Sequence, residues 1–373
     1  MPDKTLAHFQ PSAMSTTFQS IVFVSLLSLI STAAYGQNKL DVVAQAIEKG
    51  DYNLAINELE TLKKTVKVAL PPRAYKYEFD ICYHFHEIAS THADRVHWFT
   101  RMVATLEQAS QQTVTNEFLP EMQQKLMALH SGYRKTAAGL LLEQKTDEFL
   151  PINDLYILSG LAVGEQMQHH VYQSAEFAKL ANNLPLAIRH YQQAVALDFE
   201  AQLAYANWIS LLRVQRLREK ADTVLMQATL AFPESNIDQL VKALENYEKK
   251  LYFTALKEVE ASLLSDPENH TLHYLLGLIN LKTDRVDVAV DGFHRVEELV
   301  AESYLTNYQL GKYYMHEGIT KQDAGALSIA GFSLSQCESM QRNDLFLYQT
   351  ILTFCEAVKD EKNATRIRAL LMN

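Results

Sequence analysis

The strongest constraint on the fold is a set of residues that recurs every 34 positions through the C-terminal half of the chain. Four alanines stand at this step: Ala187, Ala221, Ala255 and Ala289. The same interval separates Pro233 from Pro267 and Gly277 from Gly311. Self-similarity at a fixed period of this length is the signature of a solenoid, in which stacked units contact only their neighbours. The chain is therefore predicted to be a repeat protein.

Each unit carries the pattern of two amphipathic helices. The units are set to begin at Gln168, Gln202, Asn236, His270 and Tyr304. In the second of them, apolar residues at spacings of three and four run to Leu212, and after a polar gap they resume at Ala221. Small residues let two helix axes approach closely, and the two prolines stand where the second helix has to end. Because a single hairpin cannot bury its own apolar face, several must stack.

The units resemble the tetratricopeptide repeat family, whose pattern is a large residue followed by Leu-Gly, Tyr, Ala, Phe, Ala and Pro. The matching residues are Leu276-Gly277, Ala289 and Phe293 in one unit and Leu310-Gly311 and Tyr314 in the next. The likeness covers residues 168–373, just over half of the chain. It implies an all-α fold, a right-handed superhelical solenoid of antiparallel helix pairs. In this register Gly277 lies where two helices touch, whereas Gly292 is expected to have no packing role.

The sequence departs from the family pattern at two places. Phe199 stands where proline is expected, and beyond Tyr314 an insertion of seven residues is needed to restore the fit. The second-helix positions after this insertion are Ala330, Leu334 and Cys337. A last unit begins at Leu345, places Ala364 at the alanine position and ends at the C-terminus.

The region before the repeats is predicted to form helix pairs of weaker pattern. A first pair is expected over residues 37–67, with Ala55 at the position of the recurrent alanines. A linker is expected from Val68 to Arg73, because its two prolines forbid helix. Two more helices are expected from Ala74 to about Gln112, and residues 113–166 are interpreted as degenerate hairpins. The predicted organisation is a leader over 1–36, an N-terminal helical region over 37–166 and a repeat domain over 167–373.

The predicted leader has the pattern of an export signal. Ile21–Ile30 is a predominantly apolar run of ten residues, and the small residues Ala34 and Gly36 follow it. The run is shorter than the ~20 residues of a membrane-spanning helix, so cleavage before Gln37 is predicted. The mature protein is then periplasmic or secreted. The alternative is an uncleaved segment that anchors the chain to the inner membrane, with the protein facing the periplasm.

The charge of the chain limits the class of partner that is expected, and the positions of the cysteines indicate their role. With 34 Lys and Arg against 44 Asp and Glu, the net charge is −10 and no basic stripe is present, which disfavours a nucleic-acid partner. Cys337 and Cys355 are expected to be small core residues, with a bridge between them as the alternative in an exported protein.

No residue pattern indicates catalysis or metal binding. His84 and His86 point to opposite sides of a helix, and His86-Glu87 lacks the second histidine of the zinc-protease motif. Neither a phosphate-binding glycine loop nor a nucleophile elbow is present. The sequence therefore predicts no enzyme, no cofactor and no metal, and indicates no small-molecule substrate. Two alternatives stay open: an enzyme or other module in residues 70–165 with the repeats as a targeting domain, and a self-associating structural subunit.

The family resemblance implies a concave groove, lined by the first helix of each unit, that receives a peptide or a partner protein. The groove residues expected in this register are Tyr172, Arg213, Leu240, Leu244, Tyr247, Tyr274, Leu278, Tyr308 and Lys312. Packing is expected to leave this face free, although leucine and tyrosine at helical spacing are equally typical of a core. The predicted function is a non-enzymatic scaffold for protein–protein interaction in the cell envelope.

The export prediction is tested by N-terminal sequencing of the mature protein from its own host. A chain that begins at or near Gln37 in the soluble envelope fraction is expected. An intact Met1 or Met14 in that fraction would contradict cleavage.

Overall fold

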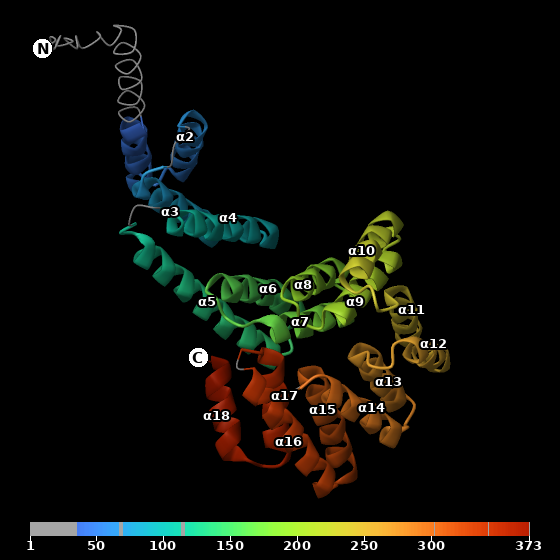
Figure 1. Cartoon of the computed structure of the whole chain (residues 1–373). Coiled ribbons are helices and arrows are strands. Elements are labelled where there is room, and N and C mark those ends of the chain that lie inside the picture. The colour runs from blue at the N-terminus through green and yellow to red at the C-terminus, as the bar shows by residue number, and fades with distance from the viewer. Residues whose placement is uncertain (1–35, 67–69, 113–115, 302, 342, 373) are drawn as a thin grey trace, which may run out of the picture. The chain divides into compact units, whose positions relative to one another are not determined.

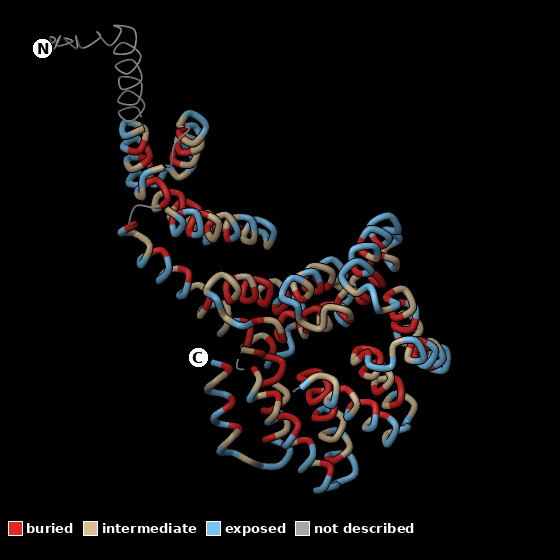
Figure 2. Tube along the Cα trace, in the orientation of Figure 1, coloured by how far each residue is buried: buried red, intermediate tan, exposed pale blue. Residues whose placement is uncertain are grey.

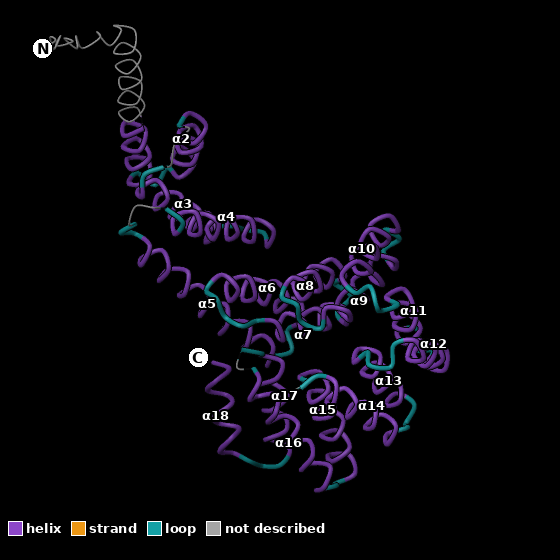
Figure 3. Tube along the Cα trace, viewed as in Figure 1, coloured by secondary structure: helices purple, strands orange, loops and turns teal. Residues whose placement is uncertain are grey.

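The described chain consists of helices joined by short turns. The computed structural model describes residues 36–66, 70–112, 116–301, 303–341 and 343–372. Figure 3 shows helices and loops but no strand over these residues. The predicted leader lies outside them except for Gly36, which belongs to a helix described over residues 36–48. Within the described ranges, none of the helices is both long and apolar enough to span a membrane.

The chain forms two compact units, residues 1–126 and 127–373. The division falls inside α5 (Leu119–Leu142), which contributes residues to both. The predicted domain boundary between residues 166 and 167 is placed where the 34-residue repeats begin, which is a different criterion from compactness. It stays a prediction.

The first unit packs the helix over residues 36–48 with three labelled helices. These are α2 (Tyr52–Thr65), α3 (Pro72–Ile88) and α4 (His92–Ser110). Ala55, Leu59 and Leu62 of α2 are buried in one apolar cluster with Ile81 of α3. The predicted helix pair around Ala55 is therefore present, and its core continues into the next helix.

A buried carboxylate joins three helices of this unit. Glu78 of α3 accepts hydrogen bonds from Lys63 Nζ of α2 at 2.6 Å and from Arg101 Nη2 of α4 at 2.9 Å. Two cations offset the cost of removing the carboxylate from water, so replacement of either one leaves a buried charge undercompensated.

Pro71 and Pro72 do not exclude helix in the way that the linker prediction assumes. Pro72 is the first residue of α3, and Pro71 precedes it with extended backbone. The first turn of a helix has N–H groups without partners, so proline loses nothing there and its fixed φ suits the helix. Of the predicted linker Val68–Arg73, Pro72 and Arg73 belong to α3, while Val68 and Ala69 lie outside the described residues. Pro151 differs from Pro72: it is the sixth residue of α6 (Thr146–Ala162), beyond the first turn, so the helix lacks one backbone hydrogen bond there.

The second unit is a series of antiparallel helix pairs (Figure 1). After α6 the helices are α7 (Gln168–Leu180), α8 (Leu184–Ala196), α9 (Ala201–Val214), α10 (Arg218–Ala231), α11 (Ile237–Glu248), α12 (Tyr252–Ser265), α13 (His270–Lys282), α14 (Val286–Leu299), α15 (Tyr304–Lys321), α16 (Ala324–Met340), α17 (Leu345–Ala357) and α18 (Glu361–Met372). The first helix of each unit begins at the predicted residue or one residue away from it. The predicted all-α solenoid of tetratricopeptide-like helix pairs is confirmed.

The recurrent small residues lie where the two helices of a pair meet. The alanines at positions 187, 221, 255, 289, 330 and 364 are all at most 1% exposed. Figure 2 shows buried residues along the faces on which successive helices meet. The insertion lengthens α15 and α16 to 18 and 17 residues, against 13 and 14 in α13 and α14. Leu334 still packs on Gly311, so the register survives the insertion as predicted.

The turn inside each hairpin repeats a backbone geometry without repeating a residue type. Residues with positive φ stand at Asn182, Arg216, Lys250 and Asp284, again 34 positions apart. Each follows a first helix and has the left-handed conformation that ends helices and usually favours glycine. The sequence pattern does not reveal these positions, because four different side chains occupy them.

Gly277 and Gly292 face each other across α13 and α14. A Cβ atom on Gly277 would lie 2.5 Å from the Phe293 ring, and one on Gly292 would lie 3.3 Å from the Gly277 amide nitrogen and the His273 carbonyl oxygen. The expectation that Gly292 has no packing role is therefore wrong. It is a close contact between two helix backbones.

Gly292→Ala is expected to destabilise the protein by about 1–3 kcal/mol, because two backbones have to separate. Gly277→Leu should cost at least as much, since Phe293 already fills its space. Gly132→Ala in α5 is the matched control. Its Cβ would meet nothing within 4 Å, so it should stabilise by up to about 1 kcal/mol. Urea unfolding measures all three, and an equal gain in Gly292→Ala and Gly132→Ala would contradict the close contact.

Candidate partner-binding cavity

The second unit closes on itself, because its last hairpin packs against its first helices (Figure 1). Side chains donate to backbone carbonyls across this contact. The pairs are Tyr156 Oη to Asn343 at 3.0 Å, Gln341 Nε2 to Gln166 at 2.6 Å, Gln349 Nε2 to Leu141 at 3.2 Å and Arg134 Nη2 to Leu370 at 2.9 Å. We call this contact, between α5–α7 and residues 341–372, the seam.

Asp344 is the centre of the seam. Its buried carboxylate caps α17 by accepting from the Phe346 amide at 2.9 Å, and it also accepts from the Tyr304 hydroxyl of α15. His170 of α7 places Nδ1 3.2 Å from the same carboxylate and Nε2 2.8 Å from Asn153 Oδ1 of α6. Burial acts to raise the pKa of Asp344, but the hydrogen bonds from His170 and Tyr304 outweigh it and hold the pKa below its ordinary value. One ionised side chain therefore joins α7, α15 and α17.

Aromatic rings cover this polar centre. Phe346 has its ring centroid 5.7 Å from that of Phe149, 5.2 Å from that of Phe177 and 5.2 Å from that of His170. These rings exclude water from the Asp344 cluster, and hydrogen bonds strengthen where water is excluded.

Closure makes six helices face one cavity of about 610 Å³. The lining side chains come from α7, α9, α11, α13, α15 and α17, the first helix of six consecutive pairs, and none comes from a second helix. Each second helix lies on the outer side of its pair, as α10, α12, α16 and α18 do in Figure 1. The concave groove implied by the resemblance is thus a cavity that is partly open to solvent.

The cavity wall contains seven of the nine expected groove residues: Tyr172, Leu244, Tyr247, Tyr274, Leu278, Tyr308 and Lys312. Arg213 and Leu240 lie outside it. Arg213 pairs with Asp238 at 3.0 Å and Glu245 at 3.4 Å, which ties α9 to α11, while Leu240 is buried in the core between these helices. A binding role for any of the nine stays a prediction.

The tyrosines of the wall are more buried than the sequence register implied. Tyr274 is 5% exposed and Tyr308 is 4% exposed, so the expectation that packing leaves this face free is corrected. The physical reason is the stacking of neighbouring first helices: the Tyr308 hydroxyl lies 3.1 Å from Thr350 Oγ1 of α17, the first helix of the next pair. Burial raises the pKa of both hydroxyls, which stay protonated and available as donors.

A charged cluster in the wall was not expected from the sequence. Lys179 Nζ lies 3.0 Å from Glu176, 2.9 Å from Glu248 and 3.0 Å from Asn207 Oδ1. Burial acts to lower the pKa of Lys179, but the two carboxylates outweigh it and raise the pKa above its ordinary value. These contacts join α7 to α9 and α11. No spacing in the sequence predicts a contact between positions 179 and 248.

Two further lysines of the wall lack such partners. Among the described residues, Lys282 and Lys312 form no ion pair. The Lys312 ammonium lies 5.1 Å from the centre of the Tyr308 ring. Burial lowers the pKa of Lys312, and the positive charge of Lys282 lowers it further, although Glu176 acts in the opposite direction.

The histidines and cysteines considered from the sequence take part in packing. His84 stacks on Tyr52 with ring centroids 3.7 Å apart, and His86 places Nδ1 2.9 Å from the Arg95 carbonyl oxygen. Cys337 and Cys355 are buried free thiols. Within the described ranges, no group of three His, Cys, Asp or Glu side chains is arranged to hold a metal ion.

No family model matches the sequence, and no curated protein matches it. Solved structures that resemble the fold include PilW, described as a widely conserved type IV pilus biogenesis factor, at 17% identity over 56% of this chain and 93% of that chain, with a TM-score of 0.34. Another is the Cut9–Hcn1 hetero-tetramer of APC/C, at 13% identity over 91% and 81% of the two chains, with a TM-score of 0.35. A third is a tetratricopeptide repeat protein from Parabacteroides merdae, at 13% identity over 73% and 96%, with a TM-score of 0.25. No function is carried over from these proteins.

Burial changes the expected effect of truncating the wall tyrosines. Tyr274→Ala and Tyr308→Ala should each lower the free energy of unfolding by about 3–5 kcal/mol, because each removes a buried aromatic ring. Tyr308→Phe keeps the ring and should cost only about 1 kcal/mol for the lost hydrogen bond to Thr350. Urea unfolding followed by circular dichroism measures the three variants. Unchanged stability in both alanine variants would contradict burial and indicate that these tyrosines are exposed in a groove.

Proposed function

We propose that this protein is a non-enzymatic interaction scaffold of the cell envelope, which holds a short segment of a partner protein in the cavity of its second unit. The observation that carries the proposal is the convergence of six first helices on one cavity. Five tyrosines stand in its wall: Tyr172, Tyr247, Tyr274, Tyr308 and Tyr313. Tyrosine combines a large apolar ring with a hydroxyl that can donate or accept, a combination enriched among the anchors of protein interfaces.

The amide side chains of the wall favour an extended segment over a helix. An extended segment presents unpaired backbone groups, and amides in the wall, such as those of Gln173, Gln309 and Gln349, are able to pair with them. The expected partner therefore contributes a flexible tail or linker rather than a folded surface.

The envelope location rests on the N-terminal sequence. The apolar run Ile21–Ile30 and the small residues before Gln37 favour export, which places the scaffold in the periplasm or outside the cell. An uncleaved segment would hold the same scaffold at the inner membrane, facing the periplasm.

Site-specific photocrosslinking tests the use of the cavity. Benzoylphenylalanine replaces Leu278, which lies in the wall on α13, and in a separate variant it replaces Phe253, which is 73% exposed on α12. Irradiation in the protein's own host should give a discrete adduct from position 278. Mass spectrometry should locate that adduct in one short segment of one partner.

The control position distinguishes the outcomes. The same adduct from both positions, or none from position 278, would contradict binding in the cavity. An adduct between two copies of this chain would favour the structural-subunit alternative instead. Light scattering of the purified protein measures that self-association independently.

A further inference from the structure

The charges in the cavity wall do not cancel. Three lysines and two glutamates face the cavity: Lys179, Lys282, Lys312, Glu176 and Glu248. The sum is +1, on a chain whose net charge is −10. Both glutamates already contact Lys179, so Lys282 and Lys312 are the charges without an ion-pair partner in the described structure. The cavity is locally suited to an anion although the protein as a whole is acidic.

The two unpartnered lysines belong to adjacent pairs and act on each other. Lys282 ends α13, and Lys312 lies within α15. Burial is the main cause that lowers the pKa of Lys312; the charge of Glu176 opposes it, and the charge of Lys282 lowers the pKa further. Two cations held near each other in a partly desolvated space are stabilised when an anion enters between them.

Each of these lysines has an apolar neighbour one helical turn before it in the same wall. Leu278 precedes Lys282 by four residues, and Tyr308 precedes Lys312 by four residues. Residues four apart share one face of a helix. The wall therefore presents two ammonium groups beside apolar side chains, to which α17 adds Phe346.

We propose that the cavity binds a carboxylate carried on a compact apolar body, with the carboxylate between Lys282 and Lys312 and the apolar body against Leu278 and Tyr308. This inference rests on the proposed use of the cavity as a binding site and names the chemistry of its occupant. The net charge of +1 in the wall suits a single negative charge better than a dianion. The volume lies within the range of about 300–1,000 Å³ typical of sites for small ligands.

This chemistry has two possible sources. One is a free organic acid, which the sequence did not indicate. The other is an aspartate or glutamate next to an apolar residue in the segment of a partner protein. Both bring the same two features to the cavity, so one pair of lysine variants tests them together.

The test compares two fluorescent probes that share the same aromatic rings. Anilinonaphthalenesulfonate carries one negative charge, and phenylnaphthylamine carries none. Lys282→Gln and Lys312→Gln should each weaken binding of the sulfonate about tenfold, the loss expected for one charge-assisted contact. Binding of the uncharged probe should change less than twofold. Added salt should reduce binding of the sulfonate to the wild-type protein but not to the doubly substituted protein.

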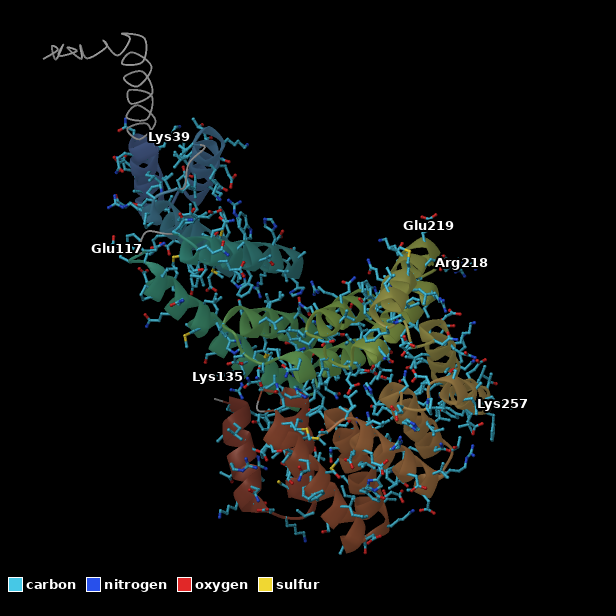
Figure 4. The ribbon with its side chains drawn as sticks, in the orientation of Figure 1. Lys39, Glu117, Lys135, Arg218, Glu219 and Lys257 are labelled. Carbon is cyan, nitrogen blue, oxygen red and sulfur yellow. The ribbon has the colours of Figure 1, made fainter. Side chains whose placement is uncertain are left out.

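Lys257→Gln is the matched control. Lys257 is exposed on α12 and labelled at the outer edge of the second unit in Figure 4. The same change of charge there should alter neither affinity, and thermal melts should give similar midpoints for all lysine variants. Equal loss of both probes in the cavity variants, or unchanged binding of the sulfonate, would overturn the anion site.

Displacement of the bound sulfonate separates the two sources. Phenylpropionate represents the free acid, and a short end-blocked peptide with glutamate beside phenylalanine represents the partner segment. Displacement by the acid alone assigns a free ligand, and displacement by the peptide assigns a partner side chain. Equal displacement by the amide of the acid or by the glutamine peptide would overturn the inference. If the lysine variants bind the sulfonate as tightly as the wild-type protein while crosslinking from position 278 persists, the anion site is wrong but the proposed scaffold function is retained.

Discussion

The second unit depends on how closely the second helix of each pair approaches the first. At the α13–α14 contact the approach is limited by backbone, since a single Cβ on Gly292 would meet the main chain of α13. In the other pairs an alanine or a glycine permits a similarly close approach, as at Gly311, against which Leu334 packs. A repeated contact distance gives a repeated rotation from one pair to the next. The curvature of the unit, and hence its cavity, is the sum of these small equal steps.

The seam follows a different chemistry from the contact inside each helix pair. The two helices of a pair meet through small apolar residues, whereas the seam relies on a buried carboxylate and on side-chain donors. Two of those donors reach the last turns of helices, where carbonyl groups have no partner within the helix: Gln349 pairs with Leu141 of α5, and Arg134 pairs with Leu370 of α18. Such contacts are directional, so they fix the relative position of the two ends, which apolar contact alone would leave free to slide.

The sequence was sufficient for features that depend on neighbours in the chain. The 34-residue register located each first helix to within one residue, because helix periodicity and small-residue contacts are local. It also assigned Ala330 and Leu334 correctly to packing positions beyond the seven-residue insertion. The left-handed turns were missed, because their regularity lies in the backbone and Asn182, Arg216 and Lys250 share no side-chain property.

Features that depend on closure were not predictable in the same way. Whether a superhelix meets its own start depends on a rotation summed over six pairs, and a small error in each step becomes large at the end. The register therefore identified most of the cavity wall but described it as an open face. It missed the partners that closure brings, such as Asp344 beside His170. It also assigned Arg213 and Leu240 to the groove, although the nearest wall residues in their helices are Asn207 and Leu244.

Closure at the seam also removes the free ends of the array. An open solenoid exposes an apolar face at each terminal repeat and covers it with a dedicated capping helix that is polar on the outside. Here α17 and α18 cover α5–α7, and α5–α7 cover them in return. Residues as far apart as Arg134 and Leu370 therefore serve as neighbours. Within the second unit each end covers the other, so a truncation at one end uncovers apolar surface at the other.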